Sequence, residues 1–354
     1  MIFLTSNTLY CMRNKNIDVL KGILILFVVF YHILWCGVGY KTSPTAVLFH
    51  TTCMQAFFFV SGYLSFKVIK KQEQGLYIRK SIGKKAKNVL VPTILMFLFS
   101  IWFFNLDIVE WLNVGFKNGY WFTYVLFVFY VLLYIVVLPL QKGMQHYRDI
   151  VVMLGSLVLM VGSAFTERML GAPITNLLSL KLIFYYWFFF IAGYYWKKYS
   201  DRIDVLINNN IVRTLIFLVA IIPLHLLQDS AYKYLLECIV SISRVAVVFT
   251  LVTQSSYMGE EHLITNQLAK FGRHSLEIYF LHFYFIFGMP MVYDMLTKQI
   301  DMYVVRGAGS TFTLEVLIIV PIAICISYIC MVVRKIIDFT PPLSRFLFGP
   351  IPQD

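Results

Sequence analysis

The chain has 354 residues, of which 59% are hydrophobic and only 14% are charged, and its mean hydropathy is +0.74. A water-soluble domain cannot bury so large an apolar share, so this composition excludes most soluble folds and indicates an integral membrane protein. The formal charge of +12 does not indicate nucleic-acid binding, because the basic residues lie in short loops between apolar stretches rather than in one patch or tail.

A transmembrane helix needs about 20 apolar residues. About ten stretches meet this requirement: residues 17–37, 45–66, 88–105, 120–140, 149–165, 179–197, 211–228, 233–254, 274–293 and 314–334. We therefore predict an all-α, polytopic membrane bundle of about ten transmembrane helices. No internal repeat and no Gly/Ser- or Pro-rich linker divides the sequence, so we treat residues 1–354 as a single domain. The loops at residues 105–120 and 294–313 are long enough to cover a site.

Lysine and arginine concentrate in alternate loops, which predicts how the helices cross the membrane. One set of alternate segments, which includes both chain ends, is rich in cations. These are Arg13 and Lys15, eight residues between 67 and 87, Lys142 and Arg148, Lys197, Lys198 and Arg202, Lys270 and Arg273, and Arg334, Lys335 and Arg345. This pattern predicts that both termini are cytoplasmic. The eight cations between residues 67 and 87 exceed what orientation requires, and they suit either an anionic lipid or a phosphorylated ligand.

The first apolar stretch carries three ionisable residues, Asp18, Lys21 and His32. At 100° per residue, Lys21 and His32 point within about 20° of each other and Asp18 lies about 40° from His32, so all three share one helix face. Ionisable residues in a membrane are costly and usually line a site or pathway, which favours a functional interpretation. The alternative is an interfacial Asp18–Lys21 ion pair, with His32 making a hydrogen bond between helices.

Other polar residues lie within the predicted helices. Tyr279 and His282 share one face of the ninth stretch with a serine, but no Gly-x-Ser-x-Gly motif indicates a nucleophilic serine, and His282 is either a packed histidine or a site wall. Ser61 and Gly62 suit close helix packing. Arg244 is an intramembrane cation that needs a partner, which the sequence does not identify. The six cysteines form no CxxC pair or His/Cys cluster, so we expect neither a metal site nor a disulfide framework.

At these residues the sequence resembles the acyltransferase-3 family, the multi-pass membrane enzymes that O-acylate sugars and cell-surface glycans, including the fucose O-acetyltransferase-like members. The matching motifs are Asp18-x-x-Lys21-Gly22…His32, Phe57-Phe-Phe-Val-Ser61-Gly62-Tyr63, Trp121-Phe122, and Phe271-Gly272…Ser275-Leu276-x-Ile278-Tyr279-x-Leu281-His282. The resemblance covers about residues 13–335. Many members have Arg where Lys21 stands, and the family's basic pair before a third-helix proline is matched only loosely by Lys84, Lys85 and Lys87.

The resemblance implies an O-acyltransferase of a bacterial inner membrane that moves an acyl group, with acetyl expected, from cytoplasmic acyl-CoA to a hydroxyl of a cell-surface or lipid-linked sugar. Acyl-CoA is then a co-substrate and no cofactor is permanently bound. The implied roles are general base for His32, acyl-CoA binding for Lys21, Arg13, Lys84, Lys85 and Lys87, and support or site wall for Asp18, Ser61, Trp121, Arg244, Tyr279 and His282. Membrane lipid is a further expected partner, and a homo-oligomer is left open.

Two other functions stay open at this point. In a proton- or anion-coupled transporter, the four residues Asp18, Lys21, His32 and Arg244 would form a relay without covalent chemistry. The chain could instead be a non-catalytic partner in polysaccharide export. The acyl group, the acceptor sugar and the side of the membrane where transfer occurs are also left open by the sequence.

Overall fold

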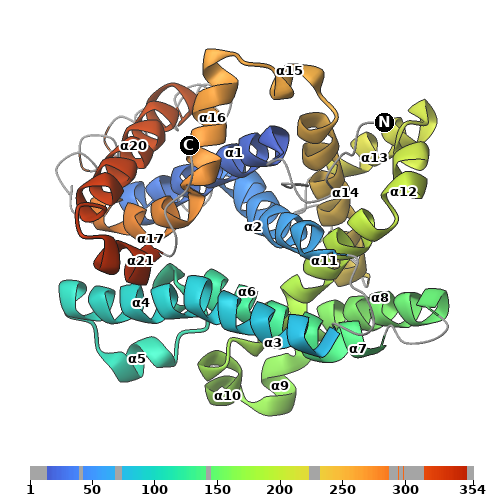
Figure 1. Ribbon diagram of the computed structural model, residues 1–354, viewed down its shortest axis with the longest axis horizontal. Helices are drawn as coiled ribbons and strands as arrows, with labels where there is room; N and C mark the ends of the chain where they lie inside the picture. Colours follow the sequence, from blue (N-terminus) through green and yellow to red (C-terminus); the bar gives the residue numbers. More distant parts are fainter. Residues whose placement is uncertain are drawn as a thin grey trace, which may run out of the picture.

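The computed structural model describes residues 14–39, 43–67, 74–140, 145–222, 232–286 and 315–348, together with the single residues Asp294 and Lys298. These residues form helices joined by short turns, and the described part of the chain contains no β-strand (Figure 1). The predicted all-α class is therefore confirmed.

Each predicted apolar stretch contains a helix. In chain order these are α1 (Lys15–His32), which continues as a π-helical segment (Ile33–Val38), α2 (Pro44–Ser65), α4 (Val91–Phe104), α6 (Trp121–Leu132), α8 (Gln145–Gly162), α11 (Leu180–Lys198), α13 (Asn210–Ala220), α14 (Lys233–Thr253), α17 (Ser275–Ile286) and α20 (Val320–Ile337). The predicted seventh stretch ran to residue 228, but α13 ends at Ala220 and residues 223–231 lie outside the described residues.

Nine shorter helices are also present, and all but α7 (Leu138–Leu140), which ends the predicted stretch 120–140, lie outside the ten stretches. They are α3 (Gln74–Lys85), α5 (Ile108–Leu112), α7 (Leu138–Leu140), α9 (Thr166–Leu170), α10 (Ala172–Leu177), α12 (Ser200–Ile207), α15 (Ser256–Gly259), α16 (Leu263–Arg273) and α21 (Pro341–Phe348) in the described part of the chain. α3 runs through a π-helical segment (Ala86–Leu90) into α4, so the third predicted stretch is part of one long helix.

Five helices in the described regions are long and apolar enough to cross a membrane. They comprise Lys15–Val38, Gly75–Phe104, Tyr147–Leu170, Lys233–Thr253 and Glu315–Ile337. A sixth candidate is the pair α12 and α13, which are bent by 84° relative to each other. This supports a membrane protein, whereas the count of ten spans and the cytoplasmic position of both termini remain predictions. The terminal residues 1–13 and 349–354 lie outside the described residues.

Helix α1 lies in the middle of the bundle and packs against α2, α14, α16, α17 and α20 (Figure 1). Its side chains Leu20, Leu24 and Val29 are fully buried. Asn14 begins the helix as an N-cap, because its side chain accepts hydrogen bonds from two backbone amides of the first turn. The ionisable stripe on α1 therefore faces protein rather than lipid.

Glycines allow α1 and α16 to touch backbone to backbone. A Cβ atom at Gly22 would lie 1.9 Å from the carbonyl oxygen of Leu268, and one at Gly272 would lie 1.8 Å from the carbonyl oxygen of Asp18. The second close crossing joins α2 and α11, where a Cβ at Gly62 would lie 1.8 Å from a carbonyl oxygen of α11. Small residues at both crossings therefore determine how closely these helices approach.

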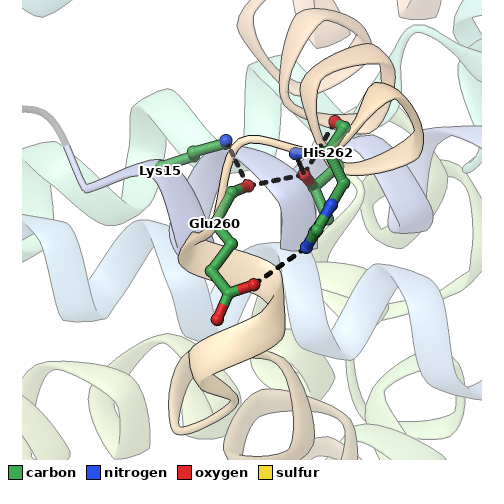
Figure 2. Close-up of polar contacts among 4 residues, drawn as sticks. Lys15, Glu260 and His262 are labelled. Carbon is green, nitrogen blue, oxygen red and sulfur yellow. Dashed lines mark hydrogen bonds and ion pairs between the residues drawn. The ribbon is translucent and has the colours of Figure 1, made fainter.

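The first turn of α1 is also tied to the chain that leads into α16. Figure 2 shows the Lys15 ammonium donating to the backbone carbonyl of Glu260 at 2.6 Å, while the Glu260 carboxylate lies 2.8 Å from Nε2 of His262. The Asn16 side chain donates to the carbonyl of Thr253 at 3.0 Å. These contacts hold the start of α1 in register with α14 and α16.

Candidate active site

Two histidines from distant helices form a hydrogen-bonded pair. His32 ends α1 and His282 lies in α17, and Nδ1 of His32 is 2.9 Å from Nε2 of His282. Nδ1 of His282 lies 2.9 Å from the carbonyl oxygen of Ile278. Since a carbonyl oxygen only accepts, Nδ1 of His282 carries a proton and donates it to that hydrogen bond.

The direction of the second hydrogen bond follows from the first. In a neutral His282 with a protonated Nδ1, Nε2 can only accept, so His32 must donate from its own Nδ1. The His282 side chain is fully buried, and the contacts of the two rings within the described regions include no carboxylate to balance a charge. An unpaired buried charge is costly, which favours the neutral pair. Nε2 of His32 consequently keeps its lone pair.

His32 also lines a cavity of about 30 Å³ between α1 and α2. Each helix contributes four residues spaced i, i+1, i+4 and i+5, which is one helix face. The lining residues are Phe27, Val28, Tyr31 and His32 from α1, Phe49, His50, Cys53 and Met54 from α2, and Gly119, Trp121 and Tyr279. This volume holds only about one or two water molecules, so the cavity admits at most a small reacting group.

The loop before α6 forms one wall of this cavity. Gly119 has a φ of +98°, and a Cβ there would lie 2.3 Å from the Phe283 ring, so glycine is required on both conformational and steric grounds. The Tyr279 hydroxyl donates to the carbonyl of Gly119. The predicted covering loop 105–120 therefore reaches the site through Gly119.

A buried lysine holds this loop in place. The Lys117 side chain is 5% exposed, and its ammonium donates to the backbone carbonyls of Leu112 and Asn176, the latter at 2.9 Å. The same ammonium lies 5.4 Å from the ring centroid of Trp111. Lys117 thus joins the loop to α10. It is not among the site residues predicted from the sequence.

The other end of the stripe, near the start of α1, is a separate ion pair. Nζ of Lys21 lies 2.9 Å from Oδ1 of Asp18, and the Lys21 side chain is 21% exposed. The cavity reaches no closer to Lys21 than Phe27, and the intervening Leu24 and Ile25 are buried. The structure therefore places Lys21 and His32 at opposite ends of α1, and the cavity at His32 does not extend to Lys21.

The other predicted acyl-CoA ligands lie on different helices from Lys21. Lys84 and Lys87 are exposed, and the ammonium of Lys85 lies 3.7 Å from the ring centroid of Tyr130. Helix α21 packs against both the Ala86–Leu90 segment and α20, and α20 packs against α1 (Figure 1). Arg13 lies outside the described residues.

Ser61 and Trp121 occupy different surroundings. Trp121 begins α6 and lines the cavity, where its ring packs 5.1 Å from that of Tyr186. Ser61 is absent from the cavity lining, and its backbone carbonyl accepts a hydrogen bond from Ser65. The structure brings Trp121, but not Ser61, to His32.

Arg244 finds its partners at the end of another helix. Its guanidinium donates from Nε to the carbonyl of Ala220 at 2.9 Å and from Nη2 to the carbonyl of Ile222 at 2.7 Å. Nη1 donates to the Thr51 hydroxyl at 3.1 Å. The cation therefore caps the C-terminus of α13, where the helix dipole favours positive charge, and links it to α2 beside His50.

The sequence analysis missed three polar cavity residues, Tyr31, His50 and Cys53. His50 is an ionisable residue inside the second predicted stretch, so the rule that singled out His32 could also have found it. Within the described regions, no group of three or more His, Cys, Asp or Glu residues is placed to hold a metal ion.

Comparison with known proteins gave one match. A family model described as an acyltransferase domain, acyltransferase-3, matches residues 14–332. The match begins at the N-cap of α1 and includes every residue that lines the cavity. Neither the curated proteins nor the solved structures gave a match.

Proposed function

The chain belongs to the acyltransferase-3 family, and from this premise we propose that it is a membrane O-acyltransferase with His32 as its general base. It moves an acyl group, expected to be acetyl, from cytoplasmic acyl-CoA to a hydroxyl of a cell-surface or lipid-linked sugar, in the inner membrane of a bacterium. The observation that carries the proposal is the hydrogen bond from His32 to His282, which leaves a basic nitrogen on a ring that lines the cavity.

In this proposal Nε2 of His32 takes the proton from the acceptor hydroxyl as its oxygen attacks the thioester carbonyl carbon. A C–O bond forms, the C–S bond then breaks, and CoA leaves as a thiolate that receives the proton back from His32. His282 is a positioning residue, since it holds the tautomer and orientation of His32. General-base catalysis of this kind contributes about 10²–10⁴-fold to the rate.

Lys21 is proposed to bind the phosphates of acyl-CoA, with Arg13, Lys84, Lys85 and Lys87 as further cations of the cytoplasmic face. The 11 residues from Lys21 to His32 span about 16 Å of helix, which an extended pantetheine arm can cover. Leu24 and Ile25 are buried between the two ends, so an arm on this path would pass beside apolar side chains.

The direct test uses the His32→Ala variant with radiolabelled acetyl-CoA and native membranes as the source of acceptor. Transfer of label to membrane glycan should be lost while the amount of protein is unchanged. His262→Ala is the matched control, because that histidine lies near the start of α16 and outside the cavity lining. Label transfer at the wild-type rate by His32→Ala would refute the assignment of the base.

A binding experiment tests the donor separately. Purified protein should bind acetyl-CoA at equilibrium, and Lys21→Ala should raise the dissociation constant, because one phosphate-binding charge is removed. A protein that binds no acetyl-CoA would contradict the proposed donor and would favour transport or a non-catalytic role in polysaccharide export.

One observation favours the transporter as a second candidate. The 84° bend between α12 and α13 is typical of the broken helices that bind ions in transporters. The bend lies at residues 208–209, and Arg244 binds the carbonyls of Ala220 and Ile222 at the opposite end of α13. Uptake of labelled solutes into proteoliposomes, tested with and without Arg244→Gln, separates this candidate from acyl transfer.

A further inference from the structure

We propose that His50 stabilises the oxyanion of the acyl-transfer reaction by donating a hydrogen bond from its imidazole, an inference that rests on the proposed O-acyltransferase function. The arrangement that supports this role is a partly exposed histidine on α2 that faces the same cavity as the base on α1.

The position of His50 places it on the wall opposite the base. Its ring centroid lies 4.6 Å from that of Tyr31, the residue next to His32, and the two planes are inclined by 30°. His32 and His50 line the same cavity. A reacting carbonyl must lie about 3 Å from both the attacking oxygen and the oxyanion donor, and two facing helices provide such an arrangement.

Few hydrogen-bond donors in the cavity are free to serve an oxyanion. The Tyr279 hydroxyl already donates to Gly119, and Nδ1 of His32 donates to His282. The His50 ring makes no hydrogen bond to any residue in the described part of the chain. In either neutral tautomer one of its ring nitrogens carries a proton, so the ring has a donor to offer.

Besides the Cys53 thiol, which is only a weak donor, two other cavity residues carry donors, and both are less suitable. Tyr31 precedes His32 on the same helix, so its side chain leaves α1 about 100° away from that of the base. The Trp121 side chain is 6% exposed and packs against the rings of Phe58 and Tyr186. His50 lies on α2, the other helix that lines the cavity, and its ring is partly exposed.

His50 stabilises the negative charge of the oxyanion and transfers no proton. As the acceptor oxygen bonds to the carbonyl carbon, the carbonyl π electrons move to oxygen, and the imidazole N–H of His50 donates to the resulting oxyanion. When the carbonyl re-forms, the C–S bond breaks and CoA leaves as a thiolate. The proton that His32 took from the hydroxyl goes to that thiolate, so His50 neither gains nor loses a proton. Donors placed in this way act mainly on the transition state.

The test compares four variants in the acetyl-CoA transfer assay: His50→Ala, His50→Gln, Tyr31→Phe and Trp121→Phe. We expect His50→Ala to lower kcat by about 10²–10³-fold, the usual effect of losing an oxyanion donor. The dissociation constant of acetyl-CoA should be unchanged, since the hydrogen bond is made in the transition state. His50→Gln restores a side-chain N–H and should recover much of the lost rate, and the two phenylalanine variants should each lower kcat less than His50→Ala does.

Three outcomes overturn the inference: a His50→Ala variant with wild-type kcat, a loss confined to acetyl-CoA affinity, or a His50→Gln variant that folds but is as impaired as His50→Ala. If His50→Ala does not fold, the test uses the folded His50→Gln variant. A kcat close to that of the wild type then supports the inference, and a kcat lowered by about 10²–10³-fold contradicts it. Failure of the proposed function is distinguishable, because then the wild-type protein transfers no acetyl group. Loss of activity in His32→Ala with full activity in His50→Ala would reject only the role of His50.

Discussion

His32 and His282 are 250 residues apart in the chain, yet their imidazoles meet at 2.9 Å inside the bundle. The contact forms because α17 packs against both α1 and the π-helical segment that follows His32. Through its second nitrogen, His282 is hydrogen-bonded to the backbone of its own helix. The orientation of the base is therefore determined by the backbone of α17, four residues before His282.

Replacing His282 should lower the rate without lowering the affinity for acetyl-CoA. His282→Leu removes the acceptor for Nδ1 of His32, so the base can rotate or change tautomer, and we expect a loss of kcat of at least about tenfold, part of the general-base contribution. In His282→Gln the amide oxygen can still accept, so this variant should be the more active of the two. Steady-state kinetics with labelled acetyl-CoA measure the effect, and equal rates for both variants would contradict a positioning role.

Adding one methyl group at the crossing of α1 and α16 should destabilise the protein. In Gly272→Ala the new Cβ would lie 1.8 Å from the carbonyl oxygen of Asp18, so one helix must move, and such overpacking costs about 1–3 kcal/mol. The melting temperature in detergent should fall. Gly155→Ala is the matched control, because a Cβ there meets nothing within 4 Å. Similar melting temperatures for both variants would show that this crossing is not tightly packed.

Removing the Arg244 guanidinium should loosen the end of α13. The carbonyls of Ala220 and Ile222 lose their donor in Arg244→Ala, and each unsatisfied buried group costs about 1–3 kcal/mol. Hydrogen exchange of residues 210–222 should become faster and the melting temperature should fall. Arg213→Ala on the same helix serves as the control, since its side chain is exposed and bonds only locally to Asn210. Unchanged exchange in Arg244→Ala would contradict the capping role.

Lys117 should make stability depend on alkaline pH. Burial lowers the pKa of the Lys117 amine in the folded protein below its ordinary value. Between the folded pKa and the unfolded pKa, about 10.4 for a free lysine, the unfolded chain binds more protons, so the free energy of unfolding increases with pH in that interval. Lys117→Met should remove this increase.

The measurement for Lys117 is the melting temperature as a function of pH for the wild type and the variant. Lys181→Met provides the control, because the Lys181 side chain is 55% exposed. As the pH rises through the alkaline range, the melting temperature of the wild type should increase relative to that of Lys117→Met. Curves that stay parallel through the alkaline range would contradict a shifted pKa for Lys117.

Much of the fold could be predicted because apolar length and helical periodicity are local properties of the sequence. The ten predicted stretches each contain a helix, and the stripe of Asp18, Lys21 and His32 lies on a helix that is enclosed by others. Short helices such as α16 could not be predicted in this way. Its sequence is mixed in polarity, and its position depends on contact with the backbone of α1 at Gly22 and Gly272.

By itself, the sequence determined the helical class, the apolar segments and the presence of His32 within one of them, since each depends on composition or spacing along one helix. Only the tertiary structure decided which groups meet: His282 with His32, Arg244 with the end of α13, and His50 with the cavity. Helical periodicity says which face a side chain occupies but not which helix covers that face. That choice depends on packing between segments up to 250 residues apart, where a few glycines permit close contact and buried polar groups must find partners.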